Sequence, residues 1–176
     1  MNKAGLLTAM AFAFAASAVS AQTAGPNDAQ IAAIVITANE VDIEAGKLAE
    51  SRGGSKAVKQ FGHQMVTDHT AVNKAAADLV RKLKVKPEQN ATSMGLRKAG
   101  DNTLNRLKGL KGAAFDKAYI DNEVTYHQTV LDALDKTLIP SAGKDELKAL
   151  LVRVRPAFAA HLEHAKQLQA SLRAAR

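Results

Sequence analysis

The pattern that decides the fold lies in residues 56–83, KAVKQFGHQMVTDHTAVNKAAADLVRKL. Its apolar residues recur every three or four positions, which is typical of one face of a helix. That face consists of Val58, Phe61, Met65, Val72, Ala76, Leu79 and Leu83. On a helical wheel His69 lies at the edge of this face, whereas His63 lies on the opposite side. The stretch therefore predicts a long amphipathic helix that turns one imidazole toward a core.

Similar spacing predicts three more long helices, over residues 29–51, 113–139 and 144–173. The first follows a leader that ends in a candidate N-cap, Asp28, and Gly53-Gly54-Ser55 separates it from the helix at 56–83. These two helices should form a tight antiparallel hairpin. Pro156 predicts a kink or a break near Val154 in the last helix. With no strand-like alternation and no internal repeat, the sequence predicts an all-α, four-helix bundle.

The connection at residues 87–113 is too long for an ordinary helix–helix loop. Gly95, Gly100, Gly109 and Gly112 interrupt it, and the sequence favours only a short helix at about 101–108. Two topologies remain open: an up-down-up-down bundle, or a crossover that runs the length of the bundle as in ferritin-like folds.

The N-terminal residues predict a secretory signal peptide over residues 1–21. Lys3 supplies a positive start, Ala4 to Ala18 is apolar, and Val19-Ser20-Ala21 offers small residues for cleavage before Gln22. The apolar run is shorter than the roughly 20 residues that span a bilayer. We therefore expect an exported, not membrane-spanning protein, with residues 22–176 as one helical-bundle domain.

Composition excludes several kinds of site. The chain has no cysteine, which excludes thiolate metal sites, iron–sulfur clusters and covalently attached c-type haem. The formal net charge of +7 is compatible with contact to anionic cell-envelope components, although solubility is the simpler explanation and the one that we favour. Nucleic acid is not an expected partner, because no motif combines aromatic and basic residues to read it.

The candidate site residues are His69, His127 and His161, each on the apolar face of a different predicted helix. Their heights along the helices allow them to converge in either topology. On the wheel of the first helix Glu44 lies beside Val41 and Leu48, and Asp42 points outward.

Glu123 lies one turn before His127 on the same side of its helix. The predicted metal ligands are therefore His69, His127, His161, Glu44 and Glu123. Glu123 could instead orient His127, and Glu44 could be a boundary carboxylate paired with a lysine.

This ligand set suits a single transition-metal ion, namely zinc, copper or iron. A di-iron centre is disfavoured because the chain contains no Glu-x-x-His motif. The aromatic-poor core argues against haem, and no nucleotide-binding loop is present. The alternative is that the histidines only pack, in a structural or envelope-interaction module. No activated nucleophile or acid–base pair points to an enzyme.

Four segments resemble a known family. They are Ile43 to Ala49, Val58 to His69, Phe115 to Tyr119 with His127 following, and Pro156 with His161 to Ala165. Together they resemble the exported bacterial proteins of the domain of unknown function 4142 family. The resemblance implies a ferritin-like bundle in the periplasm, with recurring histidines at His69, His127 and His161. Because Asp42 stands where that family commonly has Glu, the ligand from the first helix stays open between Asp42 and Glu44.

Overall fold

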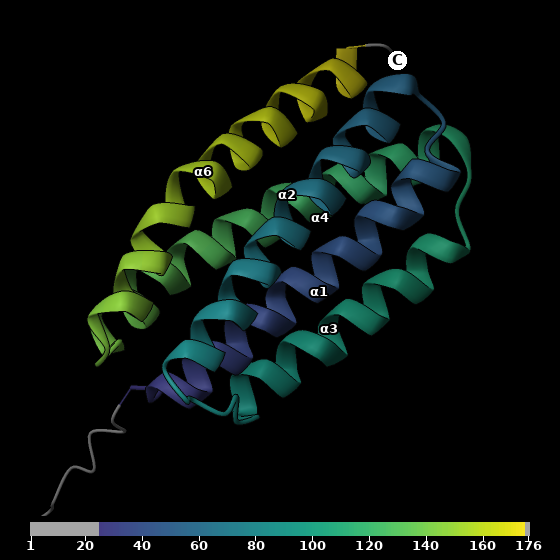
Figure 1. Ribbon diagram of the computed structural model, residues 1–176. Coiled ribbons are helices and arrows are strands. Elements are labelled where there is room, and N and C mark those ends of the chain that lie inside the picture. The colour runs from purple at the N-terminus through teal and green to yellow at the C-terminus, as the bar shows by residue number, and fades with distance from the viewer. Residues whose placement is uncertain (1–24, 175–176) are drawn as a thin grey trace, which may run out of the picture.

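The computed structural model describes residues 25–174, which form an all-α bundle (Figure 1). Its long helices are α1 (Asp28–Arg52), α2 (Lys56–Lys82), α3 (Ala91–Lys108), α4 (Gly112–Ala133) and α6 (Asp145–Ala174). A π-helical turn (Leu134–Leu138) and the short α5 (Ile139–Ser141) follow α4. The predicted signal peptide lies outside the described residues. Among the described helices, none is both long enough and apolar enough to cross a membrane.

The helix directions follow from contacts along the bundle. Helices α1 and α2 form the predicted hairpin, with Ser55 capping α2 at the backbone N–H of Val58. The connection after α2 returns to the start of α1, where the Glu88 N–H donates to the carbonyl of Ala29. Helix α3 then runs beside α1 to its far end, where Arg52 donates to the carbonyl of Lys108. Residues 87–113 are thus a full-length crossover, and α1, α2, α4 and α6 run up, down, down and up.

Helix α3 is longer than the sequence predicts, because it begins at Ala91 and not near residue 101. Asn90 starts it, since its side chain caps the N–H of Ser93 and the Ser93 hydroxyl accepts from the Asn90 N–H. Gly100 does not interrupt the helix. A Cβ there would lie 2.7 Å from the side chain of Val41, so glycine lets α3 approach α1 closely.

The predicted helix at 113–139 is confirmed in position but not in geometry. Its last part is the π-helical turn, in which the Ile139 N–H donates to the carbonyl of Leu134. Pro140 follows directly and has no N–H to continue an α-helical ladder. The predicted break near Val154 is wrong, because α6 continues as one helix through Pro156. Asp28 is likewise not the cap of α1, since Asn27 takes that position.

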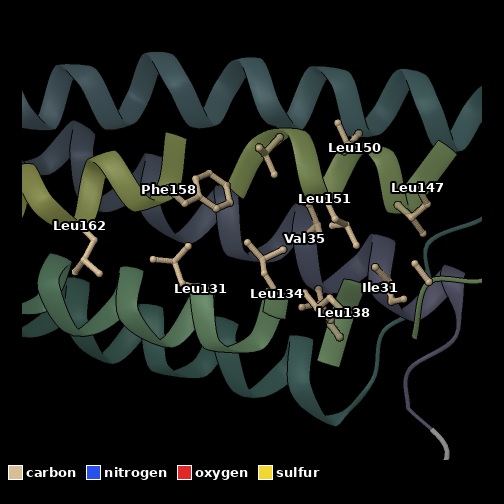
Figure 2. Packing of buried hydrophobic residues seen from close by; sticks show 14 residues of the cluster. Ile31, Val35, Leu131, Leu134, Leu138, Leu147, Leu150, Leu151, Phe158 and Leu162 are labelled. Atoms are coloured by element: carbon tan, nitrogen blue, oxygen red, sulfur yellow. The ribbon is translucent and has the colours of Figure 1, made fainter. Parts of the chain in front are cut away.

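Two apolar clusters fill the bundle, one on each side of a polar layer. Figure 2 shows the first, in which Leu131, Leu134 and Leu138 face Leu151 and Phe158 of α6. The second lies toward the α1–α2 turn and contains Ala45, Phe61, Met65, Phe115 and Tyr119. The residues between the clusters are Asp42, His69, His127 and His161, all buried.

Candidate metal centre

Three buried imidazoles meet in the middle of the bundle. His69, His127 and His161 come from α2, α4 and α6, and each is at most 2% exposed. Their ring centroids lie 5.6 Å (His69 to His127), 5.4 Å (His69 to His161) and 5.3 Å (His127 to His161) apart. One nitrogen from each ring lies within 4.8 Å of the other two. The structure therefore brings together the three histidines that the sequence selected.

Each ring has one nitrogen held by an acceptor on its outer side. Nδ1 of His69 lies 2.7 Å from Oδ1 of Asn39, whose amide nitrogen donates to the carbonyl of Val35. Nδ1 of His127 lies 3.1 Å from the carbonyl oxygen of Glu123. Nε2 of His161 lies 2.9 Å from Oδ2 of Asp68. Because all three partners accept, these three nitrogens carry the hydrogens in the neutral rings.

The remaining nitrogens, called the inner nitrogens below, are then lone-pair donors. They are Nε2 of His69, Nε2 of His127 and Nδ1 of His161, and none has a hydrogen-bonding partner among the described residues. Buried polar atoms normally find a partner, so three such atoms in one place require an explanation. An acceptor that fixes the outer nitrogen while the inner lone pair stays free is the usual arrangement of metal-binding histidines.

Asp42 adds a carboxylate to this layer from α1. It is 1% exposed, and its Oδ2 lies 2.6 Å from Nε2 of His69 and 3.7 Å from Nε2 of His127. Neither carboxylate oxygen has a well-aligned hydrogen-bond donor among the described residues. With the outer nitrogen of His69 protonated, two lone pairs would face each other across 2.6 Å. That contact is favourable only with a cation or an additional proton between the two groups.

Glu123 is the second buried carboxyl group, and its Oε2 lies 3.4 Å from Nδ1 of His127. Together Asp42, Glu123 and His127 can also bring one ligand atom each within 4.8 Å. Burial and the adjacent charge of Asp42 raise the pKa of Glu123 well above its ordinary value. Burial also acts to raise the pKa of Asp42, but His69 and His127 more than offset it, so this pKa is lowered. Asp42 is therefore the ionised member of the carboxyl pair.

The electrostatics also favour uncharged imidazoles. Burial lowers the pKa of His127 from 6.5 to about 4, although the charge of Asp42 acts in the opposite direction. Burial lowers the pKa of His161 as well, against the opposing effect of Asp68. Transition metals bind neutral imidazole, so both groups are in the ligating form at neutral pH.

The structure does not bring Glu44 into this centre. Its side chain is 43% exposed and accepts two hydrogen bonds from Arg97 of α3, at 3.0 and 3.1 Å. The helical wheel placed Glu44 on the inward face of α1, which is wrong because other helices pack against α1 on several sides. Its large residue Val41 faces α3, whereas the small residues Ala45 and Ala49 face the bundle interior.

Asp42 lies on the face of those small residues, so it points inward and not outward. A wheel centred on Val35, Ala45 and Ala49 would have selected both Asp42 and Asn39. Asp68 gave no comparable signal, since it lies beside His69 and is half-exposed.

The other two histidines stand apart from the cluster. His63 is 71% exposed and its Nδ1 lies 2.6 Å from Oε1 of Glu50. His164 is partly buried, where its Nδ1 pairs with Gln64 and its ring contacts the edge of Phe61. Both side chains have other partners, as expected from their predicted positions off the core faces.

The donor set of the layer is thus three imidazoles and one ionised carboxylate, with a protonated carboxyl beside them. Such a set can hold a transition-metal ion, because the ligands supply lone pairs and nearly balance its charge.

No curated protein and no solved structure matches the chain. A family model described as Domain of unknown function (DUF4142) matches residues 13–168. The chain therefore belongs to the DUF4142 family, and the matched range includes His69, His127 and His161.

Proposed function

We propose that this protein is an exported, ferritin-like metal-binding protein that holds one transition-metal ion at His69, His127, His161 and Asp42. The observation that carries the proposal is the convergence of three buried imidazoles beside a buried carboxylate, each with a nitrogen or oxygen that has no hydrogen-bonding partner among the described residues. Each ligand comes from a different helix, namely α2, α4, α6 and α1. Metal handling or protection against metal-driven oxidative stress is the role that such a centre supports.

The size of the cluster agrees with this proposal. Nitrogen ligands about 2.0–2.1 Å from zinc in a tetrahedral site lie about 3.3 Å apart. One nitrogen of each ring already lies within 4.8 Å of a nitrogen of the other two rings, so side-chain rotations and small shifts would close the site. A set of three imidazoles and one carboxylate suits zinc, copper or iron.

Metal stoichiometry tests the proposal. The protein is purified without a histidine tag, analysed for metals, stripped with a chelator and titrated with zinc, copper and ferrous iron by calorimetry. We expect one ion per chain. Removal of any one of the three histidines by substitution with Ala should abolish most of the affinity, and the three losses should be non-additive because the ligands act as one unit.

His63→Ala is the matched control, because His63 is exposed and lies outside the cluster. It should bind the ion as the wild type does. The competing account is an envelope-interaction module in which the histidines only pack. That account holds instead if the protein is purified metal-free and none of the three ions changes its melting temperature.

Export is the second part of the proposal and rests on the alanine-rich sequence of residues 1–21. Mass spectrometry of the protein isolated from its native cells should give an N-terminus at Gln22. A retained Met1 would contradict cleavage and favour an anchored form.

A further inference from the structure

A pocket of about 620 Å³ leads from the surface to the histidine layer. Its outer part includes the exposed residues Ala91, Thr92, Thr129 and Thr137, from α3, α4 and the π-helical turn. Its walls are mainly aliphatic and come from α1, α4, the π-helical turn and α6. His69, His127 and Asn39 also line it and are buried.

A space of this size is unusual in a bundle of about 150 residues. Protein interiors are close-packed and contain few voids larger than a water molecule, whereas small-molecule sites commonly have volumes of about 300–1,000 Å³. The π-helical turn is an independent sign, because Leu134, Thr137 and Leu138 of this turn line the pocket. Single π-helical turns inside α-helices occur frequently at functional sites.

The residues that line the pocket indicate what chemistry the body of a ligand should have. Val35, Leu134, Leu138, Leu151, Val154 and Phe158 line the pocket, and all are buried. Figure 2 shows Leu134 and Leu138 opposite Leu151 and Phe158, on both sides of this part of the core. Aliphatic and phenyl side chains bind aliphatic carbon through the hydrophobic effect and offer no hydrogen bond along its length.

The charge of the proposed metal centre indicates what head group such a ligand should have. A divalent ion held by three neutral imidazoles and the Asp42 carboxylate carries a net charge of +1. We propose that the pocket binds the alkyl chain of an aliphatic monocarboxylate, such as a fatty acid, and directs its carboxylate to the ion at His69 and His127. The head-group contact rests on the metal centre proposed above, whereas the chain-binding pocket does not.

The chain-binding part is tested on metal-free protein with 1-octanol, which has an alkyl chain but no charge for Asp42 to repel. Calorimetric titration should show one binding site. Ala133→Phe, which fills the pocket from α4, should weaken binding at least tenfold. Thr137→Trp blocks the pocket from an exposed position and should do the same.

Ala114→Phe is the matched control, because Ala114 is exposed on the same helix and does not line the pocket. It should bind 1-octanol as the wild type does, and circular dichroism establishes that each variant is folded. No binding to the wild type, or equal binding to both pocket variants, overturns the inference.

The head group is tested on cobalt-loaded protein, whose visible absorption reports the ligands of the ion. Octanoate should change the spectrum of the wild type and of Ala114→Phe, but not that of Ala133→Phe. Acetate at the same concentration should have no effect, because it lacks the chain. A spectrum that octanoate leaves unchanged overturns the head-group contact. A protein that takes up no cobalt contradicts the metal centre itself, while 1-octanol still decides whether the pocket binds a chain.

Discussion

The carboxylate of Asp42 is the residue that the sequence placed wrongly, and it changes the chemistry of the centre. Without it the imidazoles and the protonated Glu123 would bind a divalent ion without any compensating charge. Its position could not be read from the sizes of the neighbouring residues on α1, because the large residue Val41 packs against Gly100 of the crossover helix and not toward the centre. The three histidines were predictable, since α2, α4 and α6 each have one clear apolar stripe.

Asp42 and Glu44 provide a matched test on one helix. Asp42→Asn removes the buried charge while keeping the shape of the side chain, so the affinity for the ion should fall at least about tenfold. Glu44→Gln removes only a half-exposed partner of Arg97 and should leave the affinity within about twofold. Calorimetric titration with zinc measures both. The reverse order of effects would make Glu44 the ligand.

The lowered pKa of His127 predicts how the stability of metal-free protein depends on pH. In the unfolded chain this imidazole binds a proton below a pH of about 6.5, whereas in the folded protein it does so only below about 4. The unfolded state therefore binds more protons between these values, and the free energy of unfolding should fall as the pH is lowered from 6.5 to 4. The loss from this group is about 3 kcal/mol.

His127→Gln isolates this contribution, since the raised pKa of Glu123 acts in the opposite direction over part of the same range. The free energy of unfolding of chelator-treated protein is measured with urea at several pH values. As the pH is lowered from 6.5 to 4, it should fall less for the variant than for the wild type. If the free energy of unfolding depends on pH in the same way in both proteins, His127 is not buried in its neutral form.

At the scale of elements, the sequence predicted the long helices well and the crossover helix poorly. Apolar periodicity located α1, α2, α4 and α6, because each buries one face in a shared interior. Helix α3 packs mainly along α1 and only weakly on α4, so its apolar stripe is short. Glycine was misread there, since the sequence does not distinguish a glycine that breaks a helix from one that allows two helices to touch.

Gly95 and Gly100 of α3 should respond in opposite ways to the same substitution. A Cβ at Gly95 meets nothing within 4 Å, so Gly95→Ala should stabilise the protein by about 0.5–1 kcal/mol through helix propensity. A Cβ at Gly100 would lie 2.7 Å from two methyl groups of Val41, so Gly100→Ala should be destabilising. Urea unfolding measures both. Stabilisation by Gly100→Ala would mean that α3 does not pack closely on α1.

At the scale of the molecule, the proposed ion joins the four helices that form the bundle and not the crossover helix. Asp42, His69, His127 and His161 lie on α1, α2, α4 and α6, between two apolar clusters. The sequence allowed this convergence in outline, because mid-helix residues of long neighbouring helices come within a few residues of one level. It left the topology open, since that depends on the path of residues 87–113.

This arrangement predicts which amide hydrogens the ion protects from exchange. An ion that binds only the folded state at a concentration 100-fold above its dissociation constant adds about 2.7 kcal/mol to the free energy of unfolding. Amides in the middle of α1, α2, α4 and α6 exchange only when the ligands separate, so added zinc should slow them. Helix α3 contributes no ligand and can open locally, so its exchange should change little. His127→Ala should lose the zinc effect in all four helices together, as measured by mass spectrometry of peptic fragments. Protection that zinc adds to one helix alone, or to α3 as strongly as to the others, would contradict a centre shared by the four helices.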